Sequence, residues 1–161
     1  MKALSIRAPW WWFILYGGKD IENRDWPTKY RGTLLLHSSK WFNLQDVGAD
    51  SEAAVRMAHE SRKRNSGSGF TFRELRDQGG CIVGQVDLVD SVTESASPWF
   101  MGKYGFVLGN PIALRTPIPF KGALGLFEVS DALVERIQAD QFPEVRRPLL
   151  ETASQIARRK K

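Results

Sequence analysis

Residues 17–32 have the sequence GGKDIENRDWPTKYRG, and they separate the most apolar run of the chain from the apolar strand that follows. Glycine adopts left-handed backbone conformations without a steric penalty, so Gly17 and Gly18 are expected to end the apolar segment before them. If the chain then leaves as a strand, alternate side chains share one face. Glu22 and Arg24 become neighbours on that face, where the carboxylate can orient the guanidinium.

Lys19 lies at the turn and can bend over the face that carries Glu22 and Arg24. By alternation, Asp20 and Trp26 fall on the same face. The pattern therefore predicts a cationic pocket with one carboxylate and an aromatic wall, suited to an anionic or planar ligand. The alternative is a solvated charged turn whose ion pairs contribute little, and spacing alone leaves both interpretations open.

The composition is that of an ordinary globular protein, with 42% hydrophobic and 25% charged residues among 161. We expect a single domain over residues 1–161 with a sizeable core. The apolar run from Ala8 to Tyr16 is too short to span a bilayer, and no signal peptide is apparent, so no membrane association is expected. One cysteine, Cys81, excludes an internal disulfide and fits a reducing cytoplasm. Cys81, His37 and His59 are too few and too scattered to form a metal site, and no cofactor is expected.

The net charge of +5 comes largely from one end of the sequence. Residues 158–161 contribute four positive charges, so the remainder is close to neutral. A basic tail can attract phosphates, but it can equally be a solvated end.

The hydrophobic pattern predicts an α+β arrangement. Strands are expected at Lys2–Ile6, Thr33–His37, Ile82–Val89, Tyr104–Leu108 and Leu124–Val129. Helices are expected at Trp10–Tyr16, at Asp50–Arg62, from Thr71, at Ser130–Ala139 and from about Arg147. Residues 43–78 form a predicted helical insertion between two strands, and residues 147–161 a final helix with the basic tail. Because proline cannot occupy interior ladder positions, Pro111–Pro119 is expected to connect two strands.

The helix at Trp10–Tyr16 is apolar nearly all round, because three consecutive tryptophans cannot share one face. It is expected to be enclosed by the rest of the fold. One of its tryptophans could stack on a base, while the others pack in the core.

Several motifs in a fixed order resemble the ASCH domain, a family of PUA-like β-barrels associated with RNA. They are Ser5-Ile6-Arg7-x-Pro9-Trp10, Gly18-Lys19-x-x-Glu22-x-Arg24, Arg31-Gly32 with a strand ending in His37, Gly84-Gln85-Val86, Tyr104 to Leu108, and Pro119 to Leu126. The resemblance covers roughly residues 2 to 130 and departs from the common pattern at Ala8, where relatives often carry glutamine. It implies a PUA-like barrel of about five to six strands with flanking helices.

The resemblance also implies a function. The chain is expected to bind RNA or a nucleoside or nucleotide in a cleft and to act in RNA metabolism or regulation. The residues expected to contact this ligand are Arg7, Arg24, Trp26, Arg31, His37 and Tyr104.

Some ASCH relatives are small amidohydrolases acting on N4-acetylcytidine, and ribonuclease activity without a metal has also been attributed to the family. In that hydrolase pattern Lys19 matches the catalytic lysine, and a desolvated lysine can act as a base or nucleophile. Glu22 would assist it, although the hydrolase branch has threonine at this position. Both enzyme activities therefore stand as alternatives to a binding module, and the sequence indicates no oligomeric state.

Overall fold

The computed structural model describes residues 1–40 and 72–141. The helix predicted at residues 50–62, most of the insertion at 43–78, and the helix and tail predicted at 147–161 lie outside these described residues. The described residues divide into two compact units, one within Lys2–Phe127 and the other made of Met1 and Glu128–Gln141.

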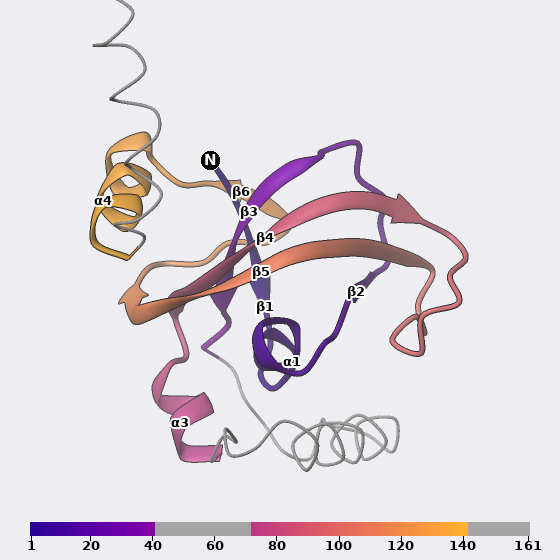
Figure 1. Ribbon diagram of the computed structural model, residues 1–161, viewed down its shortest axis with the longest axis horizontal. Coiled ribbons are helices and arrows are strands. Elements are labelled where there is room, and N and C mark those ends of the chain that lie inside the picture. The colour runs from indigo at the N-terminus through magenta and orange to yellow at the C-terminus, as the bar shows by residue number, and fades with distance from the viewer. Residues whose placement is uncertain (41–71, 142–161) are drawn as a thin grey trace, which may run out of the picture. The chain divides into compact units, whose positions relative to one another are not determined.

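The larger unit is built on a curled sheet of six strands (Figure 1). The strands are β1 (Lys2–Ile6), β2 (Ile21–Arg24), β3 (Gly32–Ser38), β4 (Cys81–Val92), β5 (Tyr104–Pro119) and β6 (Leu126–Glu128), in the spatial order β2-β5-β4-β3-β1-β6. The β1–β3 pair is parallel, whereas β3–β4, β4–β5 and β2–β5 are antiparallel. The sheet is consistent with a PUA-like barrel, and the number of strands agrees with the prediction.

The predicted connection at residues 111–119 is wrong, because β5 continues through it. β2 pairs only with Tyr104–Val107, so the second half of β5 has a partner strand on one side alone. The pairing with β4 also shifts between Gln85 and Asp87, opposite Asn110 and Pro111. Proline is tolerated at an edge or a bulge because no ladder hydrogen bond is lost there.

Helix α1 (Trp10–Tyr16) lies against β5 and β3 (Figure 1). Trp11, Phe13 and Ile14 are buried, as expected for a helix within the core. The expectation of complete enclosure is wrong at the end of the helix, where Tyr16 is 53% exposed. Trp10 and Trp12 are only partly buried, and of the two it is Trp10 that lines a pocket described below.

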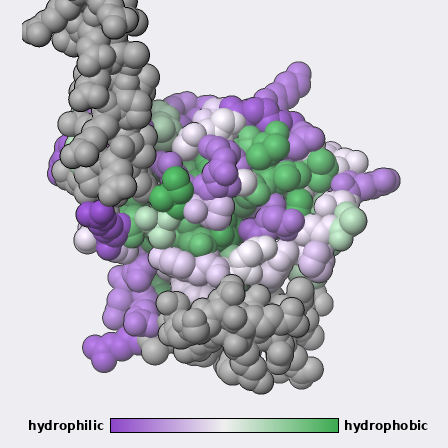
Figure 2. Space-filling model, in the orientation of Figure 1, coloured by the Kyte–Doolittle hydropathy of each residue, from purple (hydrophilic) through white to green (hydrophobic). Residues whose placement is uncertain are grey.

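The main core cluster lies between α1, the sheet and the short helix α3 (Phe72–Asp77), which contributes the buried Leu75. Its other fully buried members include Leu4, Leu34, Leu36 and Phe106. Figure 2 shows one face of the protein, on which hydrophobic residues gather toward the middle, with hydrophilic residues among and around them. No helix of the described segments is long and apolar enough to cross a membrane.

The smaller unit contains helix α4 (Asp131–Gln141), which confirms the predicted helix after Ser130. The Ser130 carbonyl accepts hydrogen bonds from the amides of Leu133 and Val134, both at 3.1 Å. Met1 and Val129 exchange two backbone hydrogen bonds of 3.1 and 2.8 Å, so the first residue of the chain is held next to the start of this helix.

Candidate functional site

The turn after α1 carries Lys19 into the protein interior. The amides of Gly17 and Lys19 both donate to the Phe13 carbonyl, at 2.9 and 3.0 Å, which closes the end of the helix. Gly18 between them has φ +71°, a left-handed conformation that glycine adopts without strain. The chain therefore reverses within two residues, and the Lys19 side chain ends only 3% exposed.

The buried ammonium of Lys19 has three contacts. It donates a hydrogen bond to the Ile21 carbonyl and another, of 3.0 Å, to Glu22 Oε2. It also lies 5.9 Å from the centre of the Trp10 ring, within the range of a cation–π contact. A buried lysine needs such partners because the interior solvates charge poorly.

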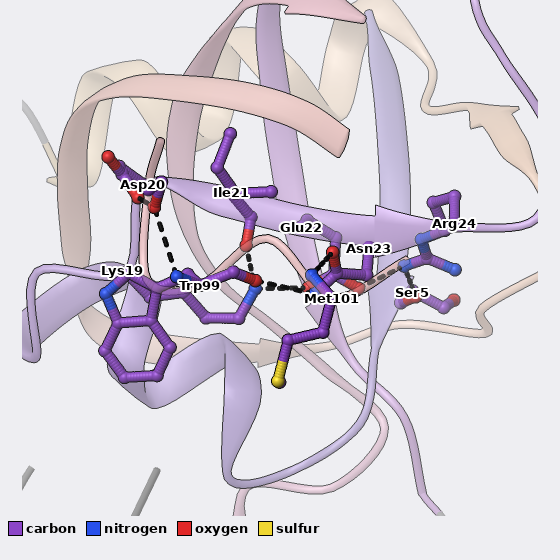
Figure 3. A network of polar contacts seen from close by, with 10 residues as sticks. Ser5, Lys19, Asp20, Ile21, Glu22, Asn23, Arg24, Trp99 and Met101 are labelled. Atoms are coloured by element: carbon purple, nitrogen blue, oxygen red, sulfur yellow. Dashed lines mark hydrogen bonds and ion pairs between the residues drawn. The ribbon is translucent and has the colours of Figure 1, made fainter. Parts of the chain in front are cut away.

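Glu22 joins two cations (Figure 3). Its Oε2 faces Lys19, and its Oε1 lies 3.0 Å from the Arg24 guanidinium. The same guanidinium nitrogen of Arg24 donates to the Ser5 carbonyl at 2.9 Å, which ties β2 to β1. The contacts predicted from alternation in a strand are thus present.

Arg24 keeps donors for a ligand. Its side chain is 21% exposed, compared with 3% for Lys19 and 11% for Glu22. Its Nε is buried and has no hydrogen-bond partner among the described residues. Of the two cations on Glu22, Arg24 is therefore the one placed to meet an oxygen of an incoming molecule.

These residues line a cavity of about 330 Å³. Its wall is formed by Ser5, Arg7, Trp10, Lys19, Glu22, Asn23, Arg24, Asp25, Trp26, Trp99, Met101 and Gly102. The volume is at the lower end of the range of about 300–1,000 Å³ that is usual for small-molecule sites. Three cations and two carboxylates leave this lining only weakly positive, so the pocket combines aromatic surface with mixed charge.

One wall is a loop that the sequence does not connect to β2. Asn23 donates to the Trp99 carbonyl at 2.8 Å and accepts from the Met101 amide at 3.0 Å. Trp99 is 7% exposed and packs against Phe13 with ring centres 5.8 Å apart. Trp99 therefore both packs in the core and lines the pocket. Alternation along β2 places Asn23 on the face opposite Glu22 and Arg24, but Asn23 lines the pocket because its side chain bonds to this loop.

The structure brings together five of the eight predicted site residues, namely Arg7, Lys19, Glu22, Arg24 and Trp26. Trp26 packs edge-on against Phe106 with ring centres 5.0 Å apart, which holds it at the pocket wall.

The other three predicted residues, Arg31, His37 and Tyr104, do not line this pocket. Arg31 pairs with Asp90 at 2.5 Å, and both are exposed. The Ser91 backbone amide, and after it Arg31, hold the pKa of Asp90 below its usual value. Tyr104 lies opposite Arg24 in the β2–β5 ladder.

His37 is buried on β3 and lines a different cavity. Its ring contacts the Ser5 hydroxyl and the Phe120 carbonyl, both at 3.0 Å. Burial lowers the pKa of His37, which favours the neutral ring. A ligand role for this residue in the Lys19 pocket remains a prediction without geometric support.

Within residues 1–40 and 72–141, no group of three histidine, cysteine or carboxylate side chains is placed to hold a metal ion. The side chains that line the pocket offer hydrogen bonds, charge and aromatic surface.

A family model of the ASCH domain matches residues 4–105, which contain α1, the Lys19 turn and β2 to β4. The chain belongs to the ASCH domain family. Human activating signal cointegrator 1 is 28% identical to it over 134 residues, which cover 74% of this chain and 21% of that protein. The chain thus spans about a fifth of the length of this relative. ASCH domains are PUA-like and are often linked to RNA binding, and all residues that line the Lys19 pocket lie within the matched range.

Proposed function

We propose that this ASCH domain binds RNA or a nucleotide by taking one base into the Lys19 pocket. The observation that carries the proposal is the shared carboxylate of Glu22, which holds Arg24 at 3.0 Å beside a partly exposed Trp26. A base has a planar face for stacking and oxygen and nitrogen atoms at its edge. Aromatic walls with a fixed guanidinium match both features.

The roles of the residues follow from their exposure. Arg24 contacts a carbonyl or phosphate oxygen, because its guanidinium is the more accessible cation. Glu22 orients Arg24, and the buried Lys19 neutralises Glu22 from behind. Trp26 stacks on the base, and Arg7 adds positive charge at the pocket wall.

Binding of a fluorescent single-stranded RNA to the full chain, measured by anisotropy, tests the proposal. Arg24→Gln should weaken the affinity about 10- to 100-fold, the effect of losing about 1.5–3 kcal/mol from a charged hydrogen bond. Arg31→Gln is the matched control, because it removes the same charge from a site outside the pocket. If both variants lost the same affinity, RNA binding would depend on net charge and not on the pocket. If the unaltered chain did not bind RNA, the proposal would be refuted.

An amidohydrolase activity is the second candidate, favoured by the buried contact of 3.0 Å between Lys19 and Glu22. In such an enzyme Lys19 would act as base or nucleophile and Glu22 would hold it. Incubation with N4-acetylcytidine followed by chromatography separates the candidates, and a binding module gives no cytidine. If the unaltered chain released cytidine and Lys19→Met did not, the amidohydrolase would replace the binding module as the proposed function. Cleavage of a short RNA without metal, lost in the same variant, would instead indicate a ribonuclease.

A further inference from the structure

A second cavity, of about 460 Å³, shares Ser5 with the Lys19 pocket. The Ser5 carbonyl accepts from Arg24 in the first pocket, whereas its hydroxyl contacts His37 in the second. The second cavity lies between the ends of β1 and β3 and the segment 120–124. It therefore adjoins the proposed base site through a single residue of β1.

The charge of this second cavity is of one sign. Its charged lining residues are Lys40 and Lys121, and the described residues around it include no carboxylate. The Lys40 side chain runs close to Gly80, where an added Cβ would lie 2.6 Å from Lys40 Cε. The absence of a side chain at Gly80 thus provides the space that Lys40 occupies. Two ammonium groups and the Ser39 hydroxyl offer hydrogen-bond donors to the cavity.

A pair of polar residues forms the inner wall. His37 Nε2 lies 3.0 Å from the Phe120 carbonyl, which can only accept, so Nε2 carries a hydrogen. In the neutral ring, Nδ1 then accepts from the Ser5 hydroxyl at 3.0 Å. In the protonated ring, Nδ1 donates to Ser5, whose hydroxyl can turn to the Ala123 carbonyl 3.1 Å away. Both protonation states leave these groups fully hydrogen-bonded.

The backbone approaches this pair closely at Gly122. A Cβ at that position would lie 2.3 Å from His37 Cε1 and 2.8 Å from Ser5 Oγ. Only glycine leaves the pair and its hydrogen bonds undisturbed. The cavity therefore holds a fixed polar pair in a partly apolar lining, with the two lysines beside it.

We propose that this second cavity binds a phosphate group of a nucleotide or of RNA. Lys40 and Lys121 supply the positive charge, and the Ser39 hydroxyl supplies a further hydrogen bond. Lysine binds phosphate as a compact point charge, and a neutral hydroxyl can donate to one of the remaining oxygens. The site does not depend on base binding in the Lys19 pocket, because inorganic phosphate alone is a sufficient probe for it.

His37 provides the readout. Burial lowers its pKa, the hydrogen bond to Phe120 partly opposes this, and the positive charge of Lys40 lowers the pKa further. A bound phosphate places negative charge beside the same ring and should raise the pKa. The expected rise is roughly half a pH unit or more, the size for a unit charge several ångströms away in a largely aqueous setting.

The experiment is an NMR pH titration of the histidine ring carbons in the full chain, in sodium chloride and in inorganic phosphate of matched ionic strength. Loss of one signal in His37→Gln assigns the resonance. The rise in phosphate should vanish in the double variant Lys40→Gln/Lys121→Gln. It should persist in Lys29→Gln/Lys103→Gln, which removes two exposed lysines outside both cavities.

An unchanged His37 pKa in phosphate, or a rise that survives loss of both Lys40 and Lys121, overturns the site. Two further probes distinguish the source of the phosphate once the site responds. Uridine 5′-monophosphate tests a terminal phosphate, and octauridylate with unphosphorylated ends tests a backbone diester. A rise in the His37 pKa with either probe supports the proposal and identifies the source of the phosphate. If neither probe raises this pKa, the proposal is overturned.

Discussion

Glu22→Gln should lower the free energy of unfolding by about 3 kcal/mol, a large effect for one isosteric substitution. The variant keeps the shape of the side chain but removes the charge between Lys19 and Arg24. The ammonium of Lys19, a residue only 4% exposed, then relies on the Ile21 carbonyl and the Trp10 ring. An unpaired buried charge is strongly destabilising because the interior does not replace its hydration.

The magnitude follows from the burial of the three partners. Breaking a buried pair by removing one member costs about 3–5 kcal/mol. The lower end applies because the Arg24 side chain is 21% exposed and can regain water. For a chain of this size, a loss of about 3 kcal/mol lowers the melting temperature by roughly 6–12 °C.

Urea unfolding followed by tryptophan fluorescence measures this loss, since Trp10, Trp26 and Trp99 line the pocket. Asp90→Asn is the control, because it breaks the exposed pair with Arg31 and should change stability little. The double variant Lys19→Met/Glu22→Gln should lose less stability than the sum of the losses in the two single variants, because it contains no unpaired ammonium. A loss in Glu22→Gln no greater than in Asp90→Asn would refute the reasoning that Glu22 compensates a buried charge.

Three further predictions concern the loop, His37 and the basic tail. Asn23→Ala should speed hydrogen exchange of the Met101 amide, because that amide donates to Asn23 at 3.0 Å, and an unchanged exchange rate would contradict the tethering role. The folded pKa of His37 lies below 6.5, so its stabilising contribution is present above pH 6.5 and is lost as the pH falls toward the folded pKa. The urea midpoint should therefore fall over that range, and less steeply in His37→Gln; identical profiles would contradict this. Removal of residues 158–161 should weaken RNA affinity and flatten its salt dependence, and an unchanged salt slope would show a solubilising end only.

The contacts that were predictable are those between residues close in sequence. Glu22 and Arg24 are two residues apart in a strand, and Lys19 lies three residues before Glu22, so local geometry is enough to join them. The turn at Gly18 follows from the conformational freedom of glycine. The helix after Pro9 and strand β1 were also predictable, because their apolar patterns are local features of the sequence.

The contacts that were missed join distant segments. Trp99 and Met101 are more than seventy residues from Asn23, and no periodicity in either segment indicates that they meet. His37 ends an apolar strand, but its partner Phe120 comes from a loop beyond β5, so its separate cavity was not foreseen. The prolines at residues 111–119 predicted a connection between strands. The sequence does not reveal that this half of β5 lies at a sheet edge, where proline is tolerated.

The sequence by itself therefore determined the charged cluster of Lys19, Glu22 and Arg24, because strand alternation and one turn place them together. Only the tertiary structure decided what surrounds that cluster. It buried Lys19, left Arg24 partly open, and placed Trp99 in the wall of the pocket and His37 outside it. The physical reason is that burial depends on which distant elements pack over a residue, and the order of strands in the sheet sets that packing.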